Sequence, residues 1–249
     1  AKIDLEVNKV SSISSDEIIS ILKNEIENFD QISKDSEVGT VVSVGDGIAN
    51  IYGIEHAMYG EIVTFENGLK GMVQDIQKDT IGCILFGSDV EIKEGTKVMR
   101  TKKKAGVPVG DKFIGRVVNA LGAPIDGAGE IEADDYRPIE NEAPGIVDRK
   151  SVSVPMETGI LSIDSMFPIG RGQRELIIGD RQTGKTSIAT DTILNQKGKD
   201  VICIYVAIGQ KASTIAKVVN TFKNGGAMDY TIVVASTASD CAPLQYIAP

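Results

Sequence analysis

The residues best suited to chemistry form one short run in the second half of the sequence. Its order is Gly179-Asp180-Arg181-Gln182-Thr183-Gly184-Lys185-Thr186, which fits the pattern G-x-x-x-x-G-K-[ST] of a phosphate-binding loop, or P-loop. The two glycines let the backbone curl so that its N–H groups point inward and form a concave anion site. Lys185 supplies a positive charge for the terminal phosphates, and the Thr186 hydroxyl can bind a magnesium ion that bridges them. The run therefore predicts a nucleotide-binding site.

The segments on both sides of this run have the patterns that would position it. Glu175–Ile178 is a short apolar run typical of a buried strand. After the loop, Ser187–Asn195 contains neither Gly nor Pro. Its apolar face consists of Ile188, Ala189, Thr192 and Ile193. A strand, a glycine loop and a helix in this order aim the amino end of the helix at the phosphates.

The chain then continues in the same alternating way. Val201–Ala207 and Thr231–Ala235 are apolar runs that predict buried strands. Between them a helix is predicted that ends at Asn224-Gly225-Gly226, with one apolar face made of Ile215, Val218, Val219 and Phe222. Strands that alternate with helices favour a parallel sheet, and ligands bind such sheets at the carboxyl ends of the strands. We therefore expect Gln210 and the loop Ser236–Asp240 to lie at the same edge as the P-loop.

The first half of the sequence has a different pattern of apolar residues and glycines. Short apolar runs between glycines predict strands at Val38–Val44, Gly47–Tyr52, Gly60–Phe65, Gly71–Ile76 and Thr80–Leu85. Several strands at close intervals favour a small antiparallel β-barrel. Thr101–Gly106 is interpreted as a linker. The predicted domains are a leader with an amphipathic helix at 1–36, the β-barrel at 37–99, and a P-loop nucleotide-binding domain at 100–249.

The amphipathic helix is predicted to begin at a possible capping box made by Ser14 and Glu17 and to end near Asp30. Its apolar stripe consists of Ile18, Ile21, Leu22, Ile26 and Phe29. The stripe is explained equally well by packing on the helix's own domain and by docking on a partner protein.

Composition excludes several classes of protein. The net charge of −9 argues against nucleic acid as a partner. The three cysteines, Cys83, Cys203 and Cys241, lie far apart and show no metal-ligand spacing. No apolar run is long enough to predict a membrane span. The amino end resembles neither a secretory signal nor a transit peptide.

Several segments together resemble the alpha subunits of rotary F-type ATP synthases. They are Pro168–Arg174 running into the P-loop, Tyr205–Lys211, Thr237–Asp240 followed by Pro243–Tyr246, Gly115–Gly127 and Val38–Tyr52. The resemblance covers nearly the whole chain. It implies a mixed fold, with a small amino-terminal antiparallel β-barrel followed by a RecA-like P-loop α/β domain that is incomplete at its carboxyl end. It also implies an amino-terminal fragment that ends before an aspartate that helps to hold magnesium and before an arginine that alpha contributes to the neighbouring catalytic site.

The resemblance further implies which residues bind nucleotide and which chemistry is lost. In this family the catalytic beta subunit carries a glutamate that polarises the attacking water, and the matching position here is Gln210. A neutral amide cannot act as a general base. We therefore expect a non-catalytic, regulatory site for ATP or ADP with Mg²⁺, no catalytic residue in this chain, and Thr186 as the metal contact. The expected nucleotide-binding residues are Gly179, Asp180, Arg181, Gln182, Thr183, Gly184, Lys185, Thr186 and Gln210.

The family implies that the chain is a subunit of an ion-transporting two-sector ATPase. Its expected partners are beta subunits in an alternating ring of six, the gamma subunit of the central stalk, and the delta subunit of the peripheral stalk through the amino-terminal helix. The expected location is the cytoplasmic face of a bacterial inner membrane, or alternatively an organelle membrane, with membrane contact only through the complex. Two alternatives stay open. One is an autonomous P-loop ATPase such as a hexameric helicase or an export ATPase, and the other is an assembly module with a vestigial P-loop.

Overall fold

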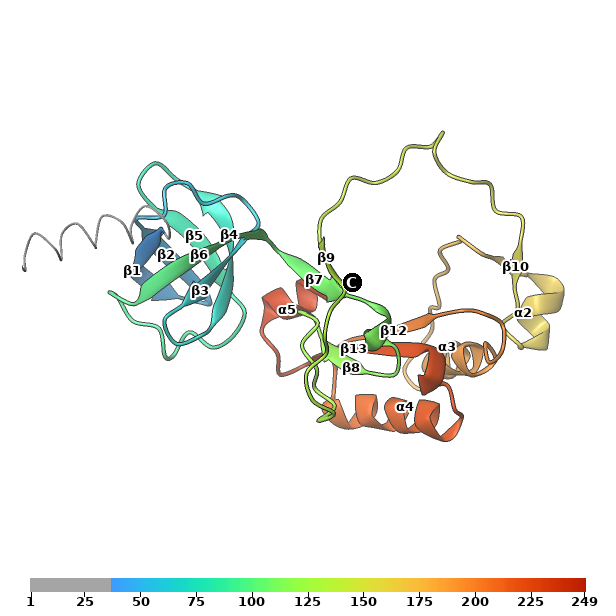
Figure 1. Cartoon of the computed structure of the whole chain (residues 1–249). Helices are drawn as coiled ribbons and strands as arrows, with labels where there is room; N and C mark the ends of the chain where they lie inside the picture. Colours follow the sequence, from blue (N-terminus) through green and yellow to red (C-terminus); the bar gives the residue numbers. More distant parts are fainter. Residues whose placement is uncertain (1–36) are drawn as a thin grey trace, which may run out of the picture.

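The structure, a computed structural model, describes residues 37–249. Figure 1 shows a β-barrel on one side and an α/β part on the other, with the segment that contains β7 and the helix α5 between them. The amphipathic helix predicted between Ser14 and Asp30 lies outside the described residues.

Six antiparallel strands close the barrel in the order β1-β2-β5-β4-β3-β6. They are β1 (Val38–Gly45), β2 (Ile48–Tyr52), β3 (Glu61–Phe65), β4 (Lys70–Ile76), β5 (Ile81–Leu85) and β6 (Lys97–Lys104). Alternate side chains point inward and form an apolar core that includes Ile51, Val63, Phe65, Val73 and Leu85. The predicted antiparallel barrel and its first five strands are confirmed.

The sixth strand corrects the prediction of a linker at Thr101–Gly106. β6 runs through Lys104 and pairs with both β1 and β3, and β7 (Gly106–Val109) begins directly afterwards. Three consecutive lysines at 102–104 show no alternation of polar and apolar residues, so the sequence carries no strand signal there. Hydrogen bonding to β3 makes this segment a strand, because it closes the barrel. The domain limits of 37–99 and 100–249 stay a prediction.

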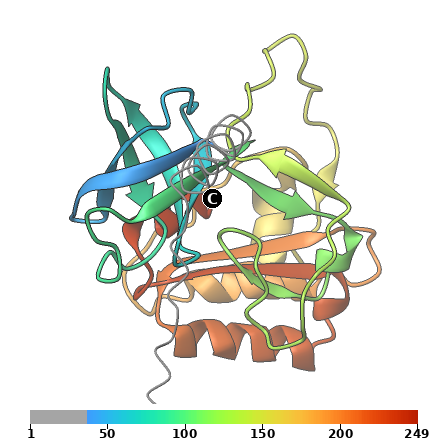
Figure 2. The same cartoon turned by 60° about the vertical axis from the view of Figure 1, so that its left-hand side comes forward.

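The α/β part contains a parallel sheet of three strands in the order β12-β13-β8. They are β12 (Cys203–Gln210), β13 (Thr231–Thr237) and β8 (Val117–Asn119). The helix α4 (Ala212–Asn224) covers one face of the sheet, at the bottom of the view in Figure 2. Its buried residues are Ile215, Val218, Val219 and Phe222, as predicted.

The prediction of a strand at Glu175–Ile178 is wrong. This segment lies within the described residues but forms no strand, and Leu176 and Ile178 are 80% and 83% exposed. The third strand of the sheet is β8 instead. An apolar run becomes a strand only when a neighbouring strand takes up its backbone hydrogen bonds. Here a cavity of 780 Å³ lies between this run and β12, so no neighbour is within reach.

The remaining elements are short. They are η1 (Asp111–Phe113), β9 (Asp135–Pro138), β10 (Pro155–Met156), α2 (Leu161–Met166), β11 (Ile169–Gly170), α3 (Lys185–Leu194), η2 (Met228–Tyr230) and α5 (Ala242–Ile247). β9 pairs with β7, and β10 pairs with β11. The chain between residues 123 and 168 is otherwise irregular, in agreement with its glycine- and proline-rich sequence.

Candidate nucleotide-binding site

The glycine run forms a loop that leads directly into a helix, as predicted. α3 begins at Lys185, and the residue before it, Gly184, has φ 87° and ψ 13°. This left-handed conformation is open to glycine without steric cost. Gln182 has φ 63°, so the loop also holds a non-glycine residue in the left-handed region. The hydroxyl of Thr183 donates to the carbonyl of Asp180 at 2.8 Å and closes the turn.

Lys185 points back over the loop that precedes it. Its Nζ donates to the carbonyl of Gly179 at 2.7 Å and to that of Asp180. The ammonium group is therefore held at the first two residues of the loop, and the N–H groups at the start of α3 lie at the loop's other end. Both kinds of donor attract an anion at this place. The loop is exposed to solvent, so a phosphate chain can reach it.

The oxygen ligands around Thr186 can hold magnesium only when a bound phosphate supplies further ligands. Among residues 37–249, no cluster of three or more His, Cys, Asp or Glu side chains could hold a metal ion. Mg²⁺ prefers six oxygen ligands and keeps several waters when it binds nucleotides. One exposed hydroxyl at Thr186 therefore fits a magnesium ion whose other ligands are phosphate oxygens and water.

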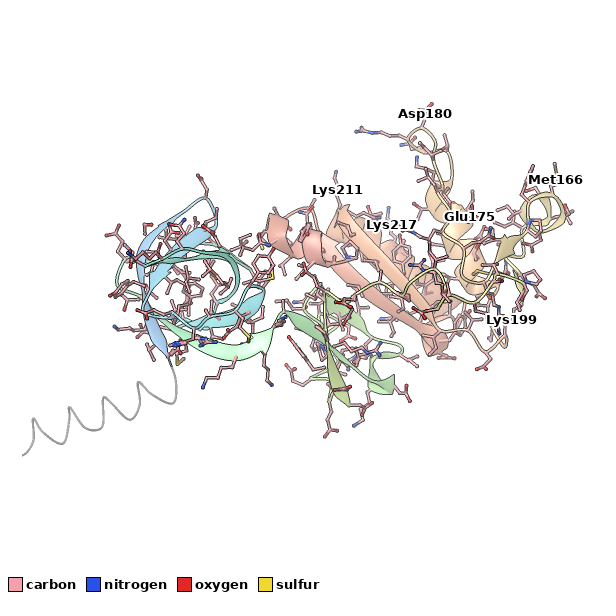
Figure 3. The ribbon with its side chains drawn as sticks, turned by 90° about the horizontal axis from the view of Figure 1, so that it is seen from above. Met166, Glu175, Asp180, Lys199, Lys211 and Lys217 are labelled. Carbon is pink, nitrogen blue, oxygen red and sulfur yellow. The ribbon has the colours of Figure 1, made fainter. Side chains whose placement is uncertain are left out.

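Gln210 is the last residue of β12, where it lies next to Thr237 of β13. Its carbonyl accepts the N–H of Ala238 at 3.0 Å. The neighbouring loop is fixed by Asp240, whose carboxylate accepts the N–H of Thr237 at 2.6 Å. Figure 3 shows Lys211 and Asp180 on the same side of the α/β part. Among residues 37–249, no hydrogen bond joins Gln210 to the P-loop.

Gln245 organises this edge, a role that no pattern in the sequence indicates. Its amide donates to the carbonyl of Asp240 at 3.1 Å and to that of Thr237 at 3.4 Å. It comes from α5, which follows β13 in the chain. The resemblance of Pro243–Tyr246 gives this glutamine no role of its own, and only the folded chain brings it to the end of β13.

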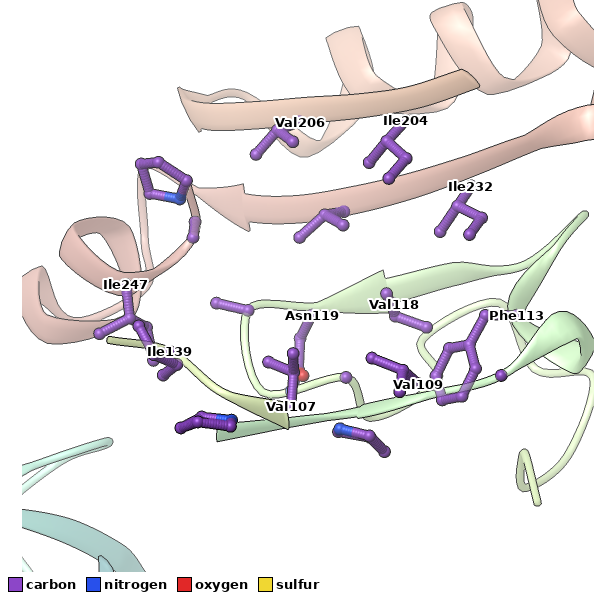
Figure 4. A pocket seen from close by; sticks show the side chains of 18 residues that line it. Val107, Val109, Phe113, Val118, Asn119, Ile139, Ile204, Val206, Ile232 and Ile247 are labelled. Atoms are coloured by element: carbon purple, nitrogen blue, oxygen red, sulfur yellow. The ribbon is translucent and has the colours of Figure 1, made fainter. Parts of the chain in front are cut away.

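A second cavity, of 360 Å³, lies on the sheet face opposite α4. Figure 4 shows Ile204, Val206 and Ile232 on one side of it and Val107 and Val109 on the other. Its one polar side chain is Asn119, whose Oδ1 already accepts backbone N–H groups at 3.0 and 2.9 Å. No charged side chain lines it, so it offers nothing to a phosphate. The P-loop is the better candidate for a nucleotide.

Two family models match the chain in the same order as its two parts. The β-barrel domain of the ATP synthase alpha/beta family matches residues 35–102, and the nucleotide-binding domain of that family matches residues 159–249. The chain belongs to the ATP synthase alpha/beta family. Both the barrel and the α/β part are therefore those of this family.

Individual relatives agree with the family models. Over 238 residues the chain is 59% identical to the ATP synthase subunit alpha of Clostridium acetobutylicum and to that of Clostridium botulinum strain Hall. These alignments cover 96% of this chain and 47% of each relative. The chain thus spans about half the length of the curated alpha subunits that it matches.

Proposed function

We propose that this chain provides the non-catalytic, regulatory Mg-ATP site of an ATP synthase alpha subunit. The observation that carries the proposal is the combination of a glycine loop, with Lys185 turned over it, and an amide, not a carboxylate, at Gln210. The nucleotide-binding residues would be the eight residues Gly179–Thr186 together with Gln210, and Thr186 would contact the metal. ATP and ADP would both bind, because the loop recognises phosphates that the two nucleotides share.

Loss of catalysis follows from the chemistry of Gln210. A general base must accept a proton, and a neutral amide does not do so at any ordinary pH. Asp240 is the carboxylate at the end of the neighbouring strand, and it already accepts the N–H of Thr237. The site would therefore hold ATP without hydrolysing it, and turnover would occur at interfaces with beta subunits.

The proposed setting is the ion-translocating ATP synthase itself. The chain would alternate with beta subunits in a ring of six around the gamma subunit, and the segment that precedes residue 37 would contact the delta subunit. The complex would lie peripherally on the cytoplasmic face of a bacterial membrane. The names of the alpha-subunit relatives support this setting. None of the helices between residues 37 and 249 combines the length and the apolar character needed to cross a bilayer.

Replacing Lys185 tests the proposal. In the complete subunit, Lys185→Ala removes a charged donor to the phosphates, and we expect Mg-ATP to bind about 10- to 100-fold more weakly. The affinity is measured by the fluorescence of a nucleotide analogue that ATP displaces. The matched control is Lys217→Ala, which removes an exposed lysine from α4 and leaves the affinity unchanged.

Two results would overturn the proposal. Equal affinities of Lys185→Ala and the parent protein would favour an assembly module with a vestigial P-loop. Hydrolysis of ATP by the isolated complete subunit at about 1 s⁻¹ or faster, the range of working enzymes, would favour an autonomous ATPase.

A further inference from the structure

The helix that carries Lys185 and Thr186 has little apolar packing over most of its length. Within the described chain, α3 has no fully buried residue. Its apolar side, made of Ile188, Ala189, Thr192 and Ile193, lines the cavity of 780 Å³ that separates it from β12. Burial of an apolar face is the usual means by which a protein fixes a helix. The apolar packing of α3 on the core under α4 comes from the partly buried Ile193 and Leu194, at its carboxyl end. The contacts at that end therefore set the position of α3.

Such contacts gather at the carboxyl end of the helix. The phenol of Tyr230 donates to the carbonyls of Ile193 and Leu194, at 3.0 and 3.2 Å. These carbonyls belong to the last turn, where a helix leaves four of them without partners inside the helix. Tyr230 is the last residue of η2 and directly precedes β13. It therefore joins the end of α3 to the start of a strand in the sheet.

The two amide side chains that directly follow the helix bind the segment at 157–159. The Nε2 of Gln196 donates to the carbonyl of Glu157 at 2.8 Å, and Gln196 is 2% exposed. The Nδ2 of Asn195 donates to the carbonyl of Thr158 at 2.9 Å. Gly159 makes room for this contact, since a Cβ there would lie 2.1 Å from that Nδ2, and its φ of +79° also favours glycine.

The segment that receives these bonds is itself fixed. The carboxylate of Asp164 in α2 accepts the N–H and the hydroxyl of Thr158 at 3.0 and 2.6 Å, and the N–H of Gly159 at 2.9 Å. These bonds, led by that of the Thr158 hydroxyl, hold the pKa of Asp164 below its usual range. Burial raises the pKa of Tyr230, so its phenol stays protonated and keeps its donor.

We propose that Tyr230, Gln196 and Asn195 form a polar clamp that positions the P-loop helix for phosphate binding. A helix of 10 residues is a rod about 15 Å long, so a shift of its clamped end moves Lys185 and Thr186 at the other end. In Figure 3, Asp180 of the loop and Lys199, which follows the clamp in the chain, lie on opposite sides of the α/β part. The three clamp residues are positioning residues, and the inference rests on the proposed function of the loop.

The test is Tyr230→Phe in the complete subunit, since this change removes the donor and keeps the ring. We expect the Kd for Mg-ATP to rise about three- to tenfold, at unchanged binding stoichiometry. The gain in ATP affinity that Mg²⁺ provides should shrink as well, because Thr186 moves with the helix. Gln196→Met, which removes the amide at similar volume, should act in the same direction. The matched control is Tyr136→Phe, which removes another phenol-to-carbonyl bond, to Lys104 in the strand β6, and leaves the Kd unchanged.

Stoichiometry separates positioning from simple loss of folded protein. A variant that only unfolds would bind less nucleotide per subunit with the parent Kd, and this result for both Tyr230→Phe and Gln196→Met would overturn the clamp. Parent values for both the Kd and the stoichiometry would overturn it too. If Lys185→Ala weakens binding in the same preparation, only the clamp has failed. If Lys185→Ala has no effect either, the proposed function has failed with it.

Discussion

Glu61 is a carboxylate buried in the wall of the barrel, and both of its oxygens accept hydrogen bonds. Its side chain is 0% exposed. Arg100 donates to Oε1 through Nε at 3.0 Å and to Oε2 through Nη2 at 2.8 Å. The N–H groups of Lys102 and Met58 donate to the same carboxylate at 2.8 and 2.9 Å. Burial alone would raise the pKa of Glu61, but the bonds from Arg100 and from the two N–H groups outweigh it and lower the pKa.

The lowered pKa predicts how the barrel responds to acid. Glu61 binds a proton more readily in the unfolded chain than in the folded one, so its contribution to stability is present above its ordinary pKa of 4.5. That contribution is lost as the pH falls through the lower pKa of the folded state. Asp126 and Asp164 also have lowered pKa values, mainly through hydrogen bonds from Arg116 and Thr158. Because these groups also lose stability in acid, the contribution of Glu61 is measured as the difference in stability between a Glu61 variant and the parent protein.

Glu61→Gln should destabilise the protein by about 3–5 kcal/mol at pH 7. The change replaces one accepting oxygen with an NH₂ group that faces donors, and it leaves Glu37 as the remaining carboxylate on the buried guanidinium of Arg100. Urea unfolding at pH 7 and at pH 3 measures the change, and the gap between variant and parent should narrow at the lower pH. Glu132→Gln, at an ion pair whose carboxylate is 84% exposed, should change stability by less than about 0.5 kcal/mol. A loss of similar size in both variants would contradict this account of Glu61.

Among the elements, those defined by local pattern were predictable and those defined by their neighbours were not. α4 shows its buried stripe in the sequence, and the barrel strands show their glycine boundaries. Glu175–Ile178 has the apolar pattern of a strand, but no other strand pairs with it. The end of β6 lacks such a pattern, but it is a strand because it pairs with β3. The P-loop was predictable because its backbone needs fixed glycines. The clamp at the end of α3 was not, because Tyr230 lies 36 residues from the carbonyl of Leu194 that it binds.

For α4 the main contact is Phe222. Its side chain is 0% exposed. Its ring packs edge to face on the ring of Tyr205 in β12, with 5.7 Å between the ring centroids. Phe222→Ala should therefore lower the free energy of unfolding by about 3–5 kcal/mol through lost burial and a cavity, as measured by urea denaturation. Phe222→Leu should cost less, since it fills more of that cavity. The control is Phe167→Ala, at a ring that is 77% exposed, with an expected change below about 0.5 kcal/mol. Equal losses at the two positions would show that α4 does not depend on Phe222.

At the scale of the molecule, the barrel and the α/β part share an apolar cluster. It contains Ile62, Met72 and Phe86 from the barrel side and Ala105, Ala120, Ile247 and Ala248 from the other. α5 carries Ile247 into this cluster and lies between the two parts in Figure 1. The sequence predicted two domains but not the contact between them, because the residues of this apolar cluster come from distant segments and share no motif.

Ile247→Asp should separate the two parts without unfolding either core. The change places a carboxylate where the native side chain is 7% exposed, and a buried charge without a partner costs several kcal/mol. The side chains of the lysines at 102–104 are already exposed, but their backbone is held in β6. The loosened junction should let this backbone open more often, so that trypsin cuts there faster than in the parent. Circular dichroism should stay close to that of the parent, because the barrel core and the core under α4 do not include Ile247. Ile146→Asp, at a side chain that is 93% exposed, should leave the rate of cleavage unchanged. Equal cleavage in all three proteins would mean that the contact between the two parts does not depend on Ile247, and that the pairing of β6 with β1 and β3 alone protects the lysines.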